Sequence, residues 1–262
     1  MVLERDIDEL IRKEVKGFPK CRKLWDMMSG DEEIASILEQ ANKVSVVRMG
    51  YNDHGRVHAK IVLLSALKIY KILEAKKLKG NIIKDDIGDD EDVRIAIMLG
   101  AYLHDTGMSI SRKFHDVLSV ILSKEIITRL LKDIYPKDFG KVVRMRSVAM
   151  ECMLCHLGMY NSTSLESKII ATADGTDITK GRARIPSMLA KLNIHKFSAL
   201  AIENVEIAEG SKKPVRVVVD MNDTTGIFQI EEQLMQKIRD VGFSEYIEIV
   251  ARIKDGREFS YL

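Results

Sequence analysis

Three short stretches of the chain combine the side chains that divalent metal ions bind most readily. His54 and His58 are four residues apart, His104 and Asp105 are adjacent, and Asp174 follows later in the chain. Neutral imidazole and carboxylate groups are common ligands of divalent transition metals. The order of a histidine, an adjacent His-Asp pair and a single aspartate therefore predicts one metal site to which all three stretches contribute.

Each stretch falls on a predicted helix or at its end. Apolar residues recur with helical spacing over 57–73 and 91–105. The segment from Thr163 to Glu166 has the spacing of a capping box, which would open a helix that ends near Asp174. Helices of a bundle can hold side chains at a common centre. We therefore expect the ligands to converge inside a helical bundle.

The chain is expected to contain a helical domain at 1–198 and a small α+β domain at 199–262. In the first part, segments with helical spacing alternate with short loops. In the second part, β-branched or alternating segments flank one helical pattern, giving a β-β-α-β order: 199–208, 214–221, 226–242 and 246–253. The expected fold class is mainly α, with this α+β unit as an appendage. Dimerisation is the role we expect for the appendage.

The composition narrows the class of function. Lys and Arg total 41 against 39 Asp and Glu, a net charge of +2, so strong nucleic-acid binding is not expected. No apolar run approaches the roughly 18 residues of a membrane span, and the N-terminal segment lacks the apolar core of a signal peptide. Three cysteines are too few for a disulfide framework. These features favour a cytoplasmic protein without a membrane partner.

Over roughly residues 50 to 186, the chain resembles the HD-domain superfamily of metal-dependent phosphohydrolases. His58 opens an apolar helix, as the first ligand histidine does in that superfamily. His104-Asp105-Thr106-Gly107 is similar to its HD-x-G motif, and IIATADGTD resembles the segment of the HD-GYP branch that carries the last ligand, here Asp174. The resemblance implies an HD-domain helical bundle in which a metal ion is bound by His58, His104, Asp105 and Asp174.

The same resemblance implies a second ion. His115 heads an apolar helix similar to the helix that carries a third histidine in HD-GYP proteins, and His156 lies near the position of their histidine pair. Members with two such additional histidines bind two ions, so we expect a binuclear site, with a single ion as the alternative. Such donors accept Mn, Fe, Co, Ni or Zn, and Mg is possible.

Further residues are expected to act on a substrate. HGRVHA resembles the HNxxHA segment of class I cyclic-nucleotide phosphodiesterases, which implies that His54 protonates the leaving oxygen; it could also be an extra ligand. Three basic residues follow the last aspartate and could neutralise a substrate phosphate, although a solvated basic loop is equally consistent: Lys180, Arg182 and Arg184.

The function implied by the resemblance is hydrolysis of a phosphomonoester or phosphodiester, nucleotide-like in kind, by metal-activated water that Asp105 helps to orient. Two alternatives stay open. Some HD proteins hold a mixed-valent di-iron centre and act as oxygenases, and others could bind a nucleotide in a regulatory role without catalysis. A homodimer is the expected assembly.

Overall fold

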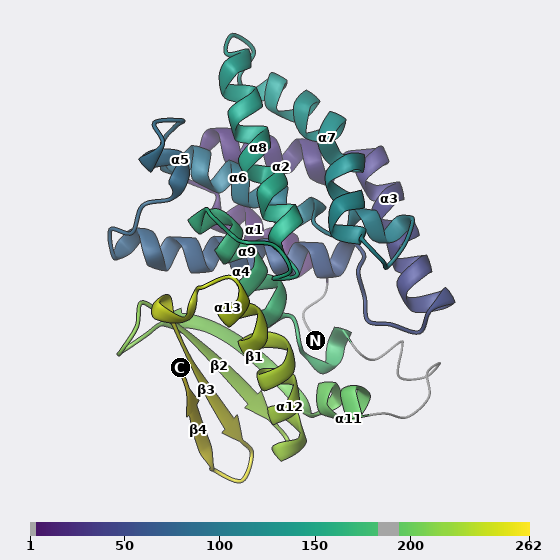
Figure 1. The fold of residues 1–262 in the computed structure, drawn as a ribbon, viewed down its shortest axis with the longest axis vertical. Coiled ribbons are helices and arrows are strands. Elements are labelled where there is room, and N and C mark those ends of the chain that lie inside the picture. The colour runs from purple at the N-terminus through teal and green to yellow at the C-terminus, as the bar shows by residue number, and fades with distance from the viewer. Residues whose placement is uncertain (1–3, 183–193) are drawn as a thin grey trace.

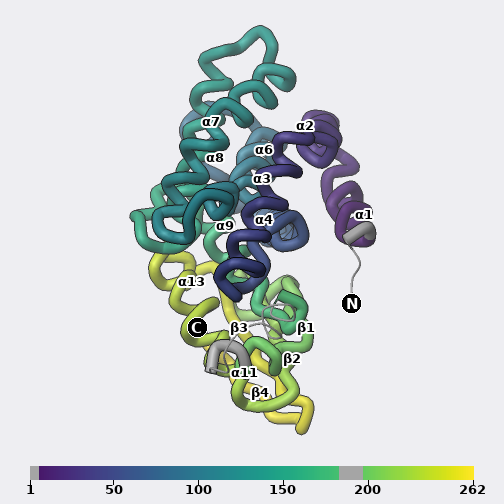
Figure 2. Tube along the Cα trace, turned by 90° about the vertical axis from the view of Figure 1, so that its right-hand side faces the viewer, coloured from purple at the N-terminus to yellow at the C-terminus, as the bar shows by residue number. Residues whose placement is uncertain are grey.

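The computed structural model describes residues 4–182 and 194–262 and shows a helical part stacked on a small sheet along the longest axis (Figures 1 and 2). The helices of the first part are α1 (Glu4–Glu14), α2 (Pro19–Ser29), α3 (Glu32–Asn42), α4 (Arg56–Ala75), α5 (Asn81–Lys84), α6 (Asp90–Leu103), α7 (His115–Ile134), α8 (Phe139–Cys155) and α9 (Leu165–Thr176). Within the described ranges, no helix is long and apolar enough to cross a membrane.

Helix α6 forms the centre of the helical part. Every residue from Asp92 to Leu103 is buried, and α6 contacts α2, α4, α8 and α9. A helix that is apolar on all sides is stable only when other helices surround it. The residues that directly follow α6, His104 and Asp105, therefore lie in the interior of the protein.

The start of α9 differs in detail from the predicted capping box. Ser164, rather than Thr163, is the N-cap, and its hydroxyl accepts a hydrogen bond from the N–H of Ser167 at 3.1 Å. The Glu166 carboxylate instead accepts from the N–H groups of Asn81 and Ile82, at 2.9 and 3.0 Å. Glu166 thus accepts hydrogen bonds from the first N–H groups of α5, which have no partner within that helix, and links α9 to α5. As predicted, Asp174 lies in the last turn of α9.

The second part begins with α11 (Ile194–Ala201) and contains one four-stranded sheet. Its strands are β1 (Ile202–Glu209), β2 (Val215–Met221), β3 (Ile247–Ile253) and β4 (Glu258–Tyr261), in the spatial order β1-β2-β3-β4. Strands β2 and β3 are parallel, and both outer pairs are antiparallel. The crossover from β2 to β3 consists of α12 (Ile227–Gln229), a π-helical turn (Ile230–Met235) and α13 (Gln236–Asp240), which together lie across the sheet (Figure 1). We call this continuous segment, 227–240, the crossover helix.

The expectation of a mainly α protein with a small C-terminal sheet is confirmed, but the predicted β-β-α-β order was incomplete. Strand β4 was missed because it is a four-residue edge strand, too short to show a clear alternating pattern. Residues 199–201, predicted as strand, belong to α11, so the predicted boundary between 198 and 199 falls inside a helix.

The two parts are in direct contact. Helix α9 packs against the π-helical turn and α13, and α4 contacts β1 and β2. The crossover helix therefore lies beside the end of α9 that carries Asp174.

Candidate metal centre

Six side chains predicted as metal ligands converge from the ends of five helices. They lie in the first turn of α4, directly after α6, at the start of α7, directly after α8 and in the last turn of α9: His58, His104 with Asp105, His115, His156 and Asp174. None of the six is more than 6% exposed. The structure thus brings all the predicted ligands into one buried cluster.

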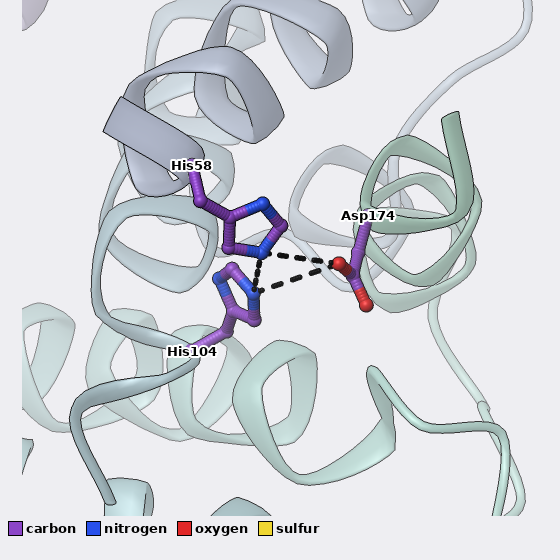
Figure 3. Close-up of side chains that lie close together, drawn as sticks. All are labelled: His58, His104 and Asp174. Atoms are coloured by element: carbon purple, nitrogen blue, oxygen red, sulfur yellow. Dashed lines mark hydrogen bonds and ion pairs between the residues drawn. The ribbon is translucent and has the colours of Figure 1, made fainter. Parts of the chain in front are cut away.

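One group within this cluster consists of His58, His104 and Asp174 (Figure 3). Nε2 of His58 lies 3.2 Å from Nε2 of His104 and 3.2 Å from Oδ1 of Asp174, and the remaining Nε2–Oδ1 distance is 3.9 Å. Ligands about 2.1 Å from a tetrahedral ion lie about 3.4 Å from one another. These three atoms could therefore hold one ion.

Asp105 connects this group to a second one. Its Oδ2 lies 3.3 Å from Nε2 of His58 and 3.2 Å from Nε2 of His104. Its Oδ1 lies 3.3 Å from Nε2 of His115 and 3.5 Å from Nε2 of His156. The Nε2 atoms of His115 and His156 are themselves 3.2 Å apart. Each oxygen of Asp105 thus faces one pair of imidazoles, which suits a carboxylate shared by two ions.

The imidazole rings are oriented by hydrogen bonds at Nδ1. In His104, His115 and His156, Nδ1 lies 2.6 to 2.8 Å from the carbonyl oxygen of the residue three positions earlier. A carbonyl oxygen only accepts, so Nδ1 carries a proton in each ring and Nε2 is the nitrogen that faces the cluster. This arrangement is typical of metal-binding histidines, whose second nitrogen is held by an outer partner.

His58 is held by a carboxylate that the sequence analysis did not assign to the site. Its Nδ1 lies 2.7 Å from Oδ2 of Asp177, and both side chains are buried. Asp177 follows α9, three residues after Asp174, so this spacing at a helix end was the available signal. Asp177 fixes the ring of His58 and raises its basicity.

The metal-free cluster holds a proton on His58. Burial and the nearby Arg182 guanidinium lower the pKa of this imidazole. Hydrogen bonds to three carboxylates outweigh both effects and raise its pKa to about 10: those of Asp105, Asp174 and Asp177. A metal ion must therefore displace a proton when it binds.

The two carboxylates among the ligands stay ionised in the interior. Burial raises the pKa of Asp174, but the Lys237 ammonium and His58 hold it well below its ordinary value. Burial likewise raises the pKa of Asp105, and the neighbouring imidazoles of His104 and His54 lower it further than burial raises it. Both groups are thus in the anionic form that binds cations.

His54 lies at the edge of the cluster. The centroid of its ring is 5.9 Å from that of His58 and 6.4 Å from that of His115. Its Nδ1 lies 2.6 Å from the carbonyl oxygen of Asn52, and burial lowers its pKa to about 3. The ring is therefore neutral near pH 7, and its Nε2 presents a lone pair, which suits an additional ligand. Its action as a general acid stays a prediction, because the ring would first have to be protonated.

The structure separates the three predicted basic residues. Arg182 reaches the cluster: its guanidinium lies 3.2 Å from Nε2 of His58 and 3.7 Å from Oδ1 of Asp174. Lys180 instead contacts the carboxylate of Glu203 on β1. Arg184 lies outside the described residues. Of the two described residues, Arg182 is thus the one that contacts the cluster.

Gly107 allows the loop after α6 to pack closely on α7. A Cβ at this position would lie 2.1 Å from the carbonyl oxygen of His115 and 2.6 Å from the backbone nitrogen of Ser119. The N–H of Gly107 donates to the Ser119 hydroxyl at 2.8 Å. This contact fixes Asp105 relative to His115, which gives a physical reason for a glycine two residues after the His-Asp pair.

The chain is similar to a protein of Methanocaldococcus jannaschii, uncharacterized protein MJ1020. The two are 38% identical over 250 residues, which cover 95% of each chain. No family model matches the chain, and no solved structure matches it. At this identity and coverage, the chain belongs to the same protein family as MJ1020.

Proposed function

We propose that this protein is a metal-dependent phosphohydrolase of the HD type, acting on a nucleotide-like phosphomonoester or phosphodiester. The observation that carries the proposal is the position of Asp105 between two pairs of imidazoles, His58 with His104 and His115 with His156. A carboxylate shared in this way, with Asp174 completing the first group, provides donors for two divalent ions. The HD-like motifs of the sequence point to the same chemistry.

The donor set fits ions such as Mn, Fe, Co, Ni or Zn, with Mg possible, because it consists of four imidazoles and two carboxylates. Bound ions would lower the pKa of water and polarise a phosphoryl oxygen. The protein's contribution is to hold the ligands in fixed orientations: all six side chains are buried and the imidazoles are held at Nδ1.

Other residues at the cluster act on the substrate. The planar guanidinium of Arg182 carries several N–H donors and a permanent charge, and it binds oxygen atoms of the substrate phosphate. His54, at the rim of the cluster, either donates a proton to the leaving oxygen or acts as a further ligand. Lys180 has no part in this scheme, since it pairs with Glu203.

The test of the proposal is the substitution Asp105→Ala. The wild-type chain, loaded with Mn²⁺, should hydrolyse p-nitrophenyl phosphate or bis(p-nitrophenyl) phosphate. The variant should lose this activity and bind less metal by elemental analysis, while circular dichroism shows an unchanged helical content. Asp133→Ala, at an exposed position of α7, is the matched control. Full activity in Asp105→Ala would refute the proposal.

An oxygenase is the second candidate, because the same donor set of four imidazoles and two carboxylates also suits two iron ions. Protein purified without oxygen distinguishes the two. An oxygenase would contain iron and show a spectrum that changes on exposure to oxygen, whereas a hydrolase would turn over phosphoesters without oxygen.

A further inference from the structure

A lysine from the C-terminal part enters the metal centre. The ammonium of Lys237, in α13, contacts Oδ2 of Asp174, and the Lys237 side chain is only 17% exposed. Oδ1 of the same carboxylate faces His58 and Arg182. Arg182 and Lys237 thus contact different oxygens of Asp174, one from the helical part and one from the crossover helix.

The crossover helix is held close to the centre at a second point. Gly158 lies two residues after His156 and has a φ of +76°, a conformation that suits glycine. A Cβ at Gly158 would lie 2.8 Å from Cβ of Asp240 at the end of α13. The crossover helix therefore packs against the loop that follows one ligand as well as against the helix that carries another.

One face of the crossover helix is polar and borders the centre. Gln229, Gln233 and Lys237 are spaced four apart, slightly more than one α-helical turn of about 3.6 residues. The π-helical turn between them is wider and absorbs the excess, so the three remain on one face. A narrow cleft of about 30 Å³ is lined by Gln229 and Gln233 on this side. Residues of the helical part also line it, among them Asn52, Asp177, Thr179 and Arg182.

The charges at this junction suit an anion once metal is bound. With His58 neutral, as metal binding requires, three buried carboxylates outnumber the two remaining cations: Asp105, Asp174 and Asp177 against Arg182 and Lys237. Binding of even one divalent ion reverses this balance. An ammonium has three N–H donors, so Lys237 can contact Asp174 and still bind a phosphate oxygen.

We propose that the crossover helix forms the second wall of the substrate site, in which Lys237 binds the phosphate group together with Arg182 and Gln233 contacts the adjoining polar part of the substrate. This inference rests on the phosphohydrolase function proposed above and extends it. It gives the C-terminal part a role in substrate binding, beside any role in dimerisation.

The test measures binding of inorganic phosphate to the full chain loaded with Mn²⁺, by isothermal titration calorimetry. Lys237→Met should weaken phosphate binding by about 10- to 100-fold, the usual effect of losing one hydrogen bond from a charged donor. Lys237→Arg should stay within about threefold of the wild type, since it keeps the charge. Arg239→Met, an exposed cation on the same helix, is the matched control and should bind phosphate normally.

Metal content, measured in every sample, separates substrate binding from an effect on the ions. Wild-type phosphate affinity in Lys237→Met, or a loss of affinity that only follows loss of metal, would overturn the inference. If Lys237→Met does not fold, the variant Gln233→Glu tests the proposal instead, because Gln233 is exposed and its substitution should not disturb the fold. The added carboxylate should weaken phosphate binding. An unchanged affinity would contradict the proposal.

The same experiment separates this inference from the proposed function. Phosphate binding that depends on Lys237, without turnover of either p-nitrophenyl phosphate or bis(p-nitrophenyl) phosphate by the wild type, would refute the hydrolase function and leave the anion site standing. Turnover by the wild type, with phosphate binding that does not depend on Lys237, would support the hydrolase function and refute the role of Lys237 in phosphate binding.

Discussion

The contact between Asp177 and His58 allows a sharp prediction about metal affinity. Oδ2 of Asp177 lies 2.7 Å from Nδ1 of His58, with side chains 2% and 0% exposed. The substitution Asp177→Asn keeps the size of the side chain, and the amide oxygen can still accept the Nδ1 proton. What it removes is the negative charge, which both orients the ring and makes it more basic.

Two effects of this change oppose each other. Loss of such an outer carboxylate weakens metal binding by about 10- to 100-fold, or about 1.4 to 2.7 kcal/mol. However, the pKa of about 10 means that a metal must displace a proton from His58 at pH 7, which costs about 4 kcal/mol. Removing one of the three carboxylates lowers that pKa and reduces this cost. Competition by protons disappears as the pH rises towards the pKa of His58, so the full loss of affinity appears only in alkaline solution.

The expected result is an affinity difference that depends on pH. Competition titrations with a chelating indicator for Mn²⁺, from pH 6 to pH 9, should show wild-type affinity rising by up to about tenfold per pH unit. Asp177→Asn should rise less steeply, so its deficit grows with pH. Asp85→Asn, at an exposed position directly after α5, is the control; its affinity for Mn²⁺ should change with pH as that of the wild type does. A wild-type affinity that does not rise with pH, or a deficit that is largest in acid, would refute the protonation of His58 in the metal-free cluster.

Three further predictions follow from the geometry. His115→Ala should reduce the metal content from about two ions to about one per chain, by elemental analysis of protein purified without oxygen; an unchanged value of about one would indicate a single-ion site. Arg182→Lys should lower kcat/KM for p-nitrophenyl phosphate about tenfold because the guanidinium fork is lost, whereas Lys180→Ala should change it less than about twofold, since Lys180 pairs with Glu203. Gly107→Ala should lower the free energy of unfolding by about 1–3 kcal/mol or more, measured by urea denaturation, because its Cβ would overlap the backbone of α7.

The positions of the ligands at helix ends followed from local sequence patterns. Apolar spacing ends at Leu103, and the next two residues are His104 and Asp105; Asp174 likewise lies in the last turn of its helix. Helix bounds depend mainly on nearby residues, through periodicity and capping, so the sequence carries this information. The mutual approach of the helices is a non-local property; it was expected from the general geometry of helical bundles and from the resemblance to HD proteins, not from the local patterns.

The features that the sequence did not reveal depend on packing between distant segments. Lys180 and Arg182 are two residues apart and similar in chemistry, yet only Arg182 reaches the cluster. Lys237 is 63 residues from Asp174, on a helix whose pattern reads as an ordinary amphipathic one. In each case the deciding contact is non-local, so no spacing in the chain signals it.

The contact of Lys237 with Asp174 also changes how the C-terminal part should be understood. A domain that served dimerisation alone would have no reason to place a cation, largely buried, on a predicted ligand of the candidate metal centre, because such a charge is costly to desolvate. Asp174 is shared between the candidate metal site and the crossover helix, so a shift of that helix changes the charge at the centre directly. The sheet, by supporting the crossover helix from its other side, therefore contributes to the geometry of the site although none of its strands carries a predicted ligand.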